Sequence, residues 1–147
     1  MSASDSLTMG GRTRPNLSLI GQGLGISVGV GIVLNAIVHL VTNRGAAFVV
    51  PDRNDATLAL KLGLGSVIAT TVIWLVIAAV GLYLIERFRP GGFLLFQMLA
   101  VAVALLSLLP ILGFDIPTDS KVGLACTHLG VAVAAVVGHT VARRSRR

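Results

Sequence analysis

Four polar side chains inside otherwise apolar stretches are the residues of this chain that could carry chemistry. They are Asn35, His39, Ser107 and His128. An imidazole can bind a metal or transfer a proton, and amide and hydroxyl groups can hydrogen-bond a ligand. Asn35 and His39 are four residues apart, a spacing that places both on one face of a helix. Because polar groups are costly in an apolar interior unless they find partners, we expect these four to face one another.

Three roles fit this polar cluster. The first is hydrogen bonding between helices, which would fix how the first and fourth apolar stretches dock. The second is a site for a small ligand or cofactor. The third is ligation of a haem iron by His39 and His128, although the chain contains no CxxCH motif. With a single cysteine, no HExxH motif and no glycine-rich phosphate loop, the sequence predicts no catalytic residue, no metal ligand set and no cofactor.

The elements that position these residues are four long stretches without Lys, Arg, Asp or Glu. They cover residues 17–42, 62–85, 90–114 and 122–142. Each is long enough to cross a bilayer, which takes about 20 apolar residues. With 54% hydrophobic and 12% charged residues, the chain has no room for a separate soluble module. We therefore predict an all-α antiparallel bundle of four transmembrane helices, spanning about 17–42, 60–86, 91–114 and 121–142.

Small residues follow two parallel lines along the first span. Gly21, Gly25 and Gly29 form one line, and Gly23, Ser27 and Gly31 form a second that continues into Asn35 and His39. The fourth span has a similar line at Gly130, Ala134, Gly138 and Ala142. Small residues at intervals of four let membrane helices approach closely. We interpret both lines as helix-packing ridges, used within the bundle or between copies. A flexible helix that moves during transport is the alternative.

Basic residues are unequal on the two sides of the predicted bundle. One side holds Arg12, Arg14, Arg87, Arg89, Arg143, Arg144, Arg146 and Arg147, and the other holds Arg44, Arg53, Lys61 and Lys121. The side richer in Lys and Arg is normally cytoplasmic, so we expect both termini inside and a location in the cytoplasmic (inner) membrane. Residues 1–16 are then a disordered cytoplasmic tail and residues 143–147 a basic tail attracted to anionic lipid. Because these charges sit at span ends, we expect the lipid bilayer and no nucleic acid as partner.

Three local features complete the expected architecture. Arg89-Pro90-Gly91-Gly92 predicts a tight turn between the second and third spans. In the long outer connection, residues 48–51 predict an extended segment on the mouth of the bundle. Pro110 should kink or end the third span. His139, near the inner end of the fourth span, is expected to reach the membrane interface.

Short motifs along the chain resemble an uncharacterised actinobacterial family of four-span membrane proteins. The resemblance rests on Asn35, Gly45, Phe48-Val49-Val50, Gly81, Leu105-Leu106-Ser107-Leu108, Pro110 and Leu124-x-x-x-His128-Leu129, and covers roughly residues 20–140. It implies topology and source but no activity. It also implies that Asn35, Ser107 and His128 belong to one feature.

Together these observations favour a non-enzymatic membrane protein. We expect either a homo-oligomer or an accessory subunit of a larger membrane complex, packing through the first span. A small-ligand-binding or transport protein that uses the polar cluster is the alternative, and a haem-binding redox protein is a further one.

Overall fold

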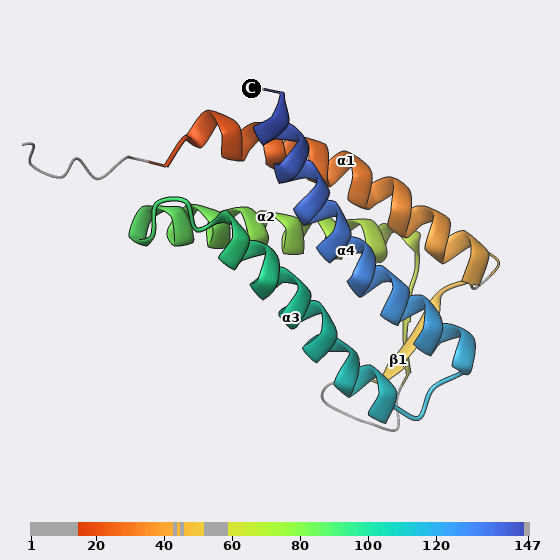
Figure 1. Ribbon diagram of the computed structural model, residues 1–147. Coiled ribbons are helices and arrows are strands. Elements are labelled where there is room, and N and C mark those ends of the chain that lie inside the picture. The colour runs from red at the N-terminus through yellow and green to blue at the C-terminus, as the bar shows by residue number, and fades with distance from the viewer. Residues whose placement is uncertain (1–14, 43, 45, 52–58, 146–147) are drawn as a thin grey trace, which may run out of the picture.

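A computed structural model describes residues 15–42, 44, 46–51 and 59–145, and shows four helices and one β-hairpin (Figure 1). The elements are α1 (Leu17–Thr42), β1 (Phe48–Pro51), β2 (Ala59–Leu62), α2 (Leu64–Phe88), α3 (Phe93–Gly113) and α4 (Thr118–Arg144). All four helices are long and apolar enough to cross a membrane. The predicted all-α four-helix membrane bundle is therefore confirmed. Except for its last two residues, the predicted disordered tail 1–16 lies outside the described residues, as do residues 146–147.

The bundle is organised around the pair α1 and α4. These two helices make the most extensive contact in the molecule, and α2 packs beside α1. The third helix, α3, lies on the outside of the bundle against α4 and α2 (Figure 1). The start of α1, the α2–α3 turn and the end of α4 lie toward one end of the molecule, and the hairpin lies at the other (Figure 1).

The hairpin changes where the second span begins. The expected extended segment at residues 48–51 is strand β1, and it pairs in antiparallel register with β2, so that Phe48 faces Leu62 and Val50 faces Leu60. Residues 60–62, which we expected to open the second span, are therefore in a strand, and α2 starts at Leu64. Apolar residues are compatible with either a strand or a membrane helix. Composition alone therefore could not separate residues 60–62 from the second span.

Two other helix ends can be compared with expectation. α3 continues past Pro110 to Gly113, so the proline does not end the helix there, because a proline so near the end removes only one of the last intrahelical hydrogen bonds. α4 starts at Thr118, three residues before the expected 121. The turn at Arg89–Gly92 is as predicted: Gly91 has a φ of 78°, and the amide of Gly92 donates to the carbonyl of Arg89 at 2.9 Å.

The interior is small and the outside is apolar. The core consists mainly of Leu75, Ala79 and Leu82 of α2 with Ala134 and Ala135 of α4. Apart from Phe96 and Ile111, which are buried, most large side chains of α3 point outward, and Leu112, for example, is 68% exposed. A helix with apolar residues on its exposed face is suited to lipid rather than water as solvent.

Candidate functional site

The contact between α1 and α4, here called the α1–α4 seam, is the best-defined site in the bundle. On α1 it uses Gly23, Ser27, Gly31, Asn35 and His39, all of which are buried. Opposing residues across the seam are Ser27 with Gly138, Gly31 with Ala134, Asn35 with Gly130, and Thr42 with Gly123. Between successive pairs, the residue number rises along α1 by the same amount as it falls along α4. The helices are therefore antiparallel and stay in register along the whole seam.

Glycines in the seam leave room for polar atoms of the facing helix. A Cβ at Gly130 would overlap the amide oxygen of Asn35, and a Cβ at Gly138 would overlap the hydroxyl of Ser27. On the α1 side, a Cβ at Gly23 would overlap Nδ1 of His139. Glycine carries only a hydrogen where other residues have Cβ, so these polar atoms can lie close to the backbone of the facing helix. The seam is thus close-packed and polar together.

Three polar atoms of α1 are buried in the seam. Among the described residues, the hydroxyl of Ser27, Oδ1 of Asn35 and Nδ1 of His39 are buried without a hydrogen bond. The first two rest against Gly138 and Gly130. Among the described glycines, none lies opposite His39 Nδ1.

Asn35 connects three helices. It is fully buried, and its amide nitrogen donates to Oγ1 of Thr71 on α2 at 2.8 Å. The Thr71 hydroxyl in turn donates to the carbonyl of Val67 at 2.7 Å. With its amide oxygen against Gly130 of α4, Asn35 uses both ends of its side chain between helices. Thr71 was missing from the predicted cluster, although it is a polar residue within a predicted span at the same depth.

His39 lies under the hairpin. Its ring meets that of Phe48 edge to face, with centroids 4.9 Å apart and planes at 82°. Phe48 is fully buried and fills the space left by Gly123 at the start of α4. Next to it, the amide of Val49 donates to the hydroxyl of Ser120 at 3.1 Å. The hairpin is therefore docked on α4, and Phe48 closes the seam above His39.

The other two residues of the predicted cluster are placed differently. Ser107 is half-buried on α3, and its hydroxyl donates to the carbonyl of Ala104 in its own helix at 2.7 Å. His128 is half-buried on α4. Within the described part of the chain, no hydrogen bond links either residue to Asn35 or His39. The structure thus brings Asn35 and His39 together with Thr71 and Phe48.

The two glycine ridges of α1 have opposite surroundings. Gly23, Ser27 and Gly31 face the bundle interior, as described above. Gly21, Gly25 and Gly29 are exposed, and no atom of the described residues lies within 4 Å of the position that a Cβ would take at any of them. We call these three residues the outward ridge.

At the other end of the seam, His139 is buried rather than extended to the interface. It is 2% exposed, and its ring packs edge to face against Phe96, with centroids 5.7 Å apart. The expectation that it reaches the interface is therefore wrong. The physical reason is Gly23, whose missing side chain leaves space for an imidazole between the helices.

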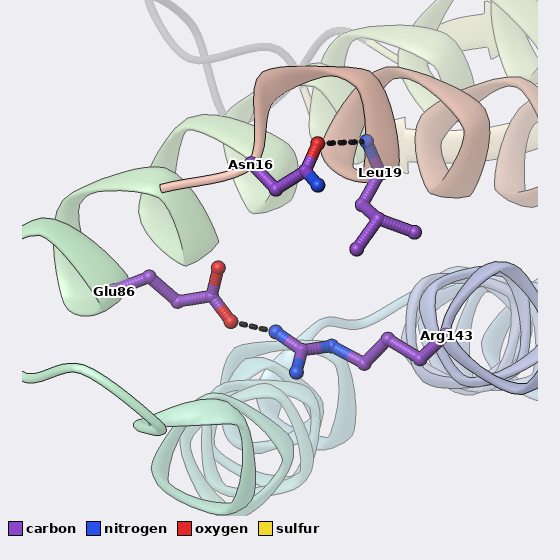
Figure 2. Close-up of polar contacts among 4 residues, drawn as sticks. All are labelled: Asn16, Leu19, Glu86 and Arg143. Atoms are coloured by element: carbon purple, nitrogen blue, oxygen red, sulfur yellow. Dashed lines mark hydrogen bonds and ion pairs between the residues drawn. The ribbon is translucent and has the colours of Figure 1, made fainter. Parts of the chain in front are cut away.

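An ion pair joins α2 and α4 beside His139. Glu86 and Arg143 point toward each other between the helices and form the pair shown in Figure 2. The Arg143 guanidinium also lies over the ring of Phe93, 4.2 Å from its centroid. A cavity of about 10 Å³, room for about one water molecule, is lined by Glu86, Arg143, His139 and neighbouring apolar residues. The sequence prediction placed Glu86 at the very end of the second span and Arg143 in the basic tail. The sequence feature that could have indicated the ion pair is that Glu86 is an acidic residue next to a strongly basic stretch.

The fold and this seam define the class: a small multi-pass membrane protein whose four helices are held by close contacts of small and polar residues. A family model matches residues 16–147, and the chain belongs to that family, DUF6069, which is described as a family of unknown function. This agrees with the expected membership in an uncharacterised family. No curated protein and no solved structure matches the chain.

Proposed function

We propose that the protein is a non-enzymatic membrane subunit that assembles with a second copy of itself through the outward ridge of α1. The observation that carries this proposal is the open face at Gly21, Gly25 and Gly29. It has the same four-residue spacing as the ridge that packs against α4, but no described residue of the chain packs on it.

The physical argument concerns what drives helices together in lipid. Lipid tails are as apolar as the helices, so association depends on close van der Waals contact and hydrogen bonding rather than on burial of apolar area. Glycines at intervals of four provide the shallow surface that such contact needs. They also cost helix stability, about 1 kcal/mol each relative to alanine. A partner helix on the outward ridge would offset that cost.

A ligand site in the polar cluster has less support. The amide of Asn35 is already occupied by Thr71, and its oxygen rests on Gly130. A haem next to His39 would have to displace Phe48, whose ring packs against that imidazole. Both observations favour a packing role for these residues, in agreement with the first of the three roles considered above.

The membrane and the orientation are also part of this proposal. We place the protein in the cytoplasmic membrane of an actinobacterium, with both termini inside, on the strength of the charge asymmetry and the sequence resemblance. Reporter fusions to the C-terminus test the orientation. A reporter active only outside the cytoplasm would contradict it.

The test of assembly is the double substitution Gly25→Leu/Gly29→Leu, which adds side chains to the outward ridge at two positions where a Cβ has no described atom within 4 Å. The matched control is Val76→Leu/Val80→Leu, with the same spacing on an exposed face of α2. Energy transfer between labelled copies in liposomes should fall sharply for the ridge variant and stay unchanged for the control. Transfer that persists in the ridge variant, or that is absent in the wild type, would rule out this interface. Association of the wild type with a different protein instead would favour an accessory subunit.

A further inference from the structure

Three exposed arginines surround the end of the bundle where α2 and α4 finish. Arg87 is in the last turn of α2, Arg89 follows it in the α2–α3 turn, and Arg144 ends α4. These ends lie toward the same end of the molecule, which also contains the start of α1 (Figure 1). We call Arg87, Arg89 and Arg144 the basic rim.

The charge of the basic rim is not neutralised by the described chain. Glu86 is the one acidic residue among the described residues at this end, and Arg143 already pairs with it. The opposite end is nearly balanced, because Asp115 and Asp119 accompany the basic residues Arg44, Lys61 and Lys121. The ion pair in Figure 2 therefore leaves three positive charges concentrated at one end.

The surroundings of the basic rim match the boundary between lipid tails and headgroups. Phe88, between Arg87 and Arg89, is 81% exposed, and the hydroxyl of Tyr83 accepts from Nη1 of Arg87 at 3.1 Å. Aromatic residues of this kind favour the membrane interface. The N-terminus of α3 begins at the same turn and has no side-chain cap among the described residues, whereas Asn16 caps α1 (Figure 2). Its partial positive charge adds to that of the arginines.

We propose that the basic rim binds the phosphate groups of anionic phospholipids. The arginines supply the charge, the uncapped start of α3 adds to it, and Phe88 lies beside the acyl chains of the same lipids. This inference does not depend on assembly through the outward ridge. A competing explanation is that Arg87 and Arg144 only complement the negative C-terminal ends of α2 and α4. That explanation predicts no preference among lipids.

Native mass spectrometry of the full chain tests the proposal. The protein is placed in micelles that contain equal amounts of phosphatidylglycerol and phosphatidylcholine, and the lipids that it retains are counted. We expect the wild type to retain phosphatidylglycerol preferentially. An arginine near a membrane surface contributes about fivefold in affinity, so R87Q/R89Q/R144Q should lower the preference by on the order of 100-fold. Because the protein is purified, the result does not depend on its orientation in the cell.

The matched control is R44Q/K61Q/K121Q, which removes the same number of charges from the opposite end. It should keep the wild-type preference. Should the triple rim variant fail to fold, R89Q alone should still lower the preference about fivefold. Equal retention of the two lipids by the wild type, or equal loss in both triple variants, would overturn the proposal. Displacement of the lipid by inorganic phosphate would overturn it too, because the site would then recognise a free anion.

Discussion

The amide oxygen of Asn35 on α1 rests against Gly130 on α4, where any side chain at residue 130 would begin. The other end of the same amide is bonded to Thr71 on α2. This one side chain therefore sets the distance between α1 and α4 and ties both to α2. The Asn35 side chain fits in this position only because residue 130 is glycine. A change at either residue is therefore expected to disturb the whole seam.

Gly130→Ala should destabilise the bundle. The new Cβ would overlap the Asn35 oxygen, and overpacking of this kind costs about 1–3 kcal/mol. Thermal unfolding in detergent measures the effect. The control is Gly81→Ala, in the middle of α2, where nothing lies within 4 Å of a new Cβ and a gain of about 0.5–1 kcal/mol is expected. Similar changes in both variants would show that helix propensity rather than the seam is responsible.

The hydrogen bond from Asn35 to Thr71 should appear as a coupling in a double-mutant cycle. We expect Asn35→Leu and Thr71→Val together to cost less than the sum of the single changes, by about 0.6 kcal/mol and at most about 1.7 kcal/mol. Thr70→Val is the control for Thr71→Val, since the exposed Thr70 hydroxyl bonds only to the carbonyl of Ser66. Strict additivity of Asn35→Leu and Thr71→Val would exclude a contribution from this bond.

Phe48→Ala should loosen the hairpin from the bundle. The substitution empties the space against Gly123 and His39, and loss of a buried phenylalanine costs about 3–5 kcal/mol. Hydrogen exchange of the Val49 amide, which donates to Ser120, should become faster while the middle of α4 stays protected. Leu60→Ala, in the facing strand and 46% exposed, is the control and should change that exchange little.

Breaking the ion pair from either side should destabilise the end of the bundle near His139. Glu86→Gln leaves Arg143 without its carboxylate, and Arg143→Gln leaves Glu86 without its cation, at a cost of about 1–3 kcal/mol each. The double variant should cost less than the two single changes added together, because it leaves no unpaired charge. Arg144→Gln, a neighbouring exposed arginine, should leave the thermal midpoint unchanged. A midpoint that falls as far for Arg144→Gln would show that total charge matters and the pair does not.

Charge and length alone determined the class of this protein. Stretches of about 20 consecutive apolar residues cross a bilayer as helices, because backbone groups must be hydrogen-bonded within the lipid and this length fits a helix. The turn at Gly91 and the extended segment at Phe48 were also predictable, since each depends on local conformational preferences. Gly91 provides the positive φ, and Phe48 begins a short β-branched and proline-ended run.

The use of the glycines was decided only by the tertiary structure. Gly21, Gly25 and Gly29 have the same spacing as Gly23, Ser27 and Gly31, so periodicity cannot say which ridge faces α4. The contacts decide it: the ridge that leads into Asn35 and His39 is buried, because polar groups in lipid need partners from other helices. The pairing of Glu86 with Arg143 joins residues far apart in the chain. Such a pair arises from helix packing, and no local pattern in the sequence contains it.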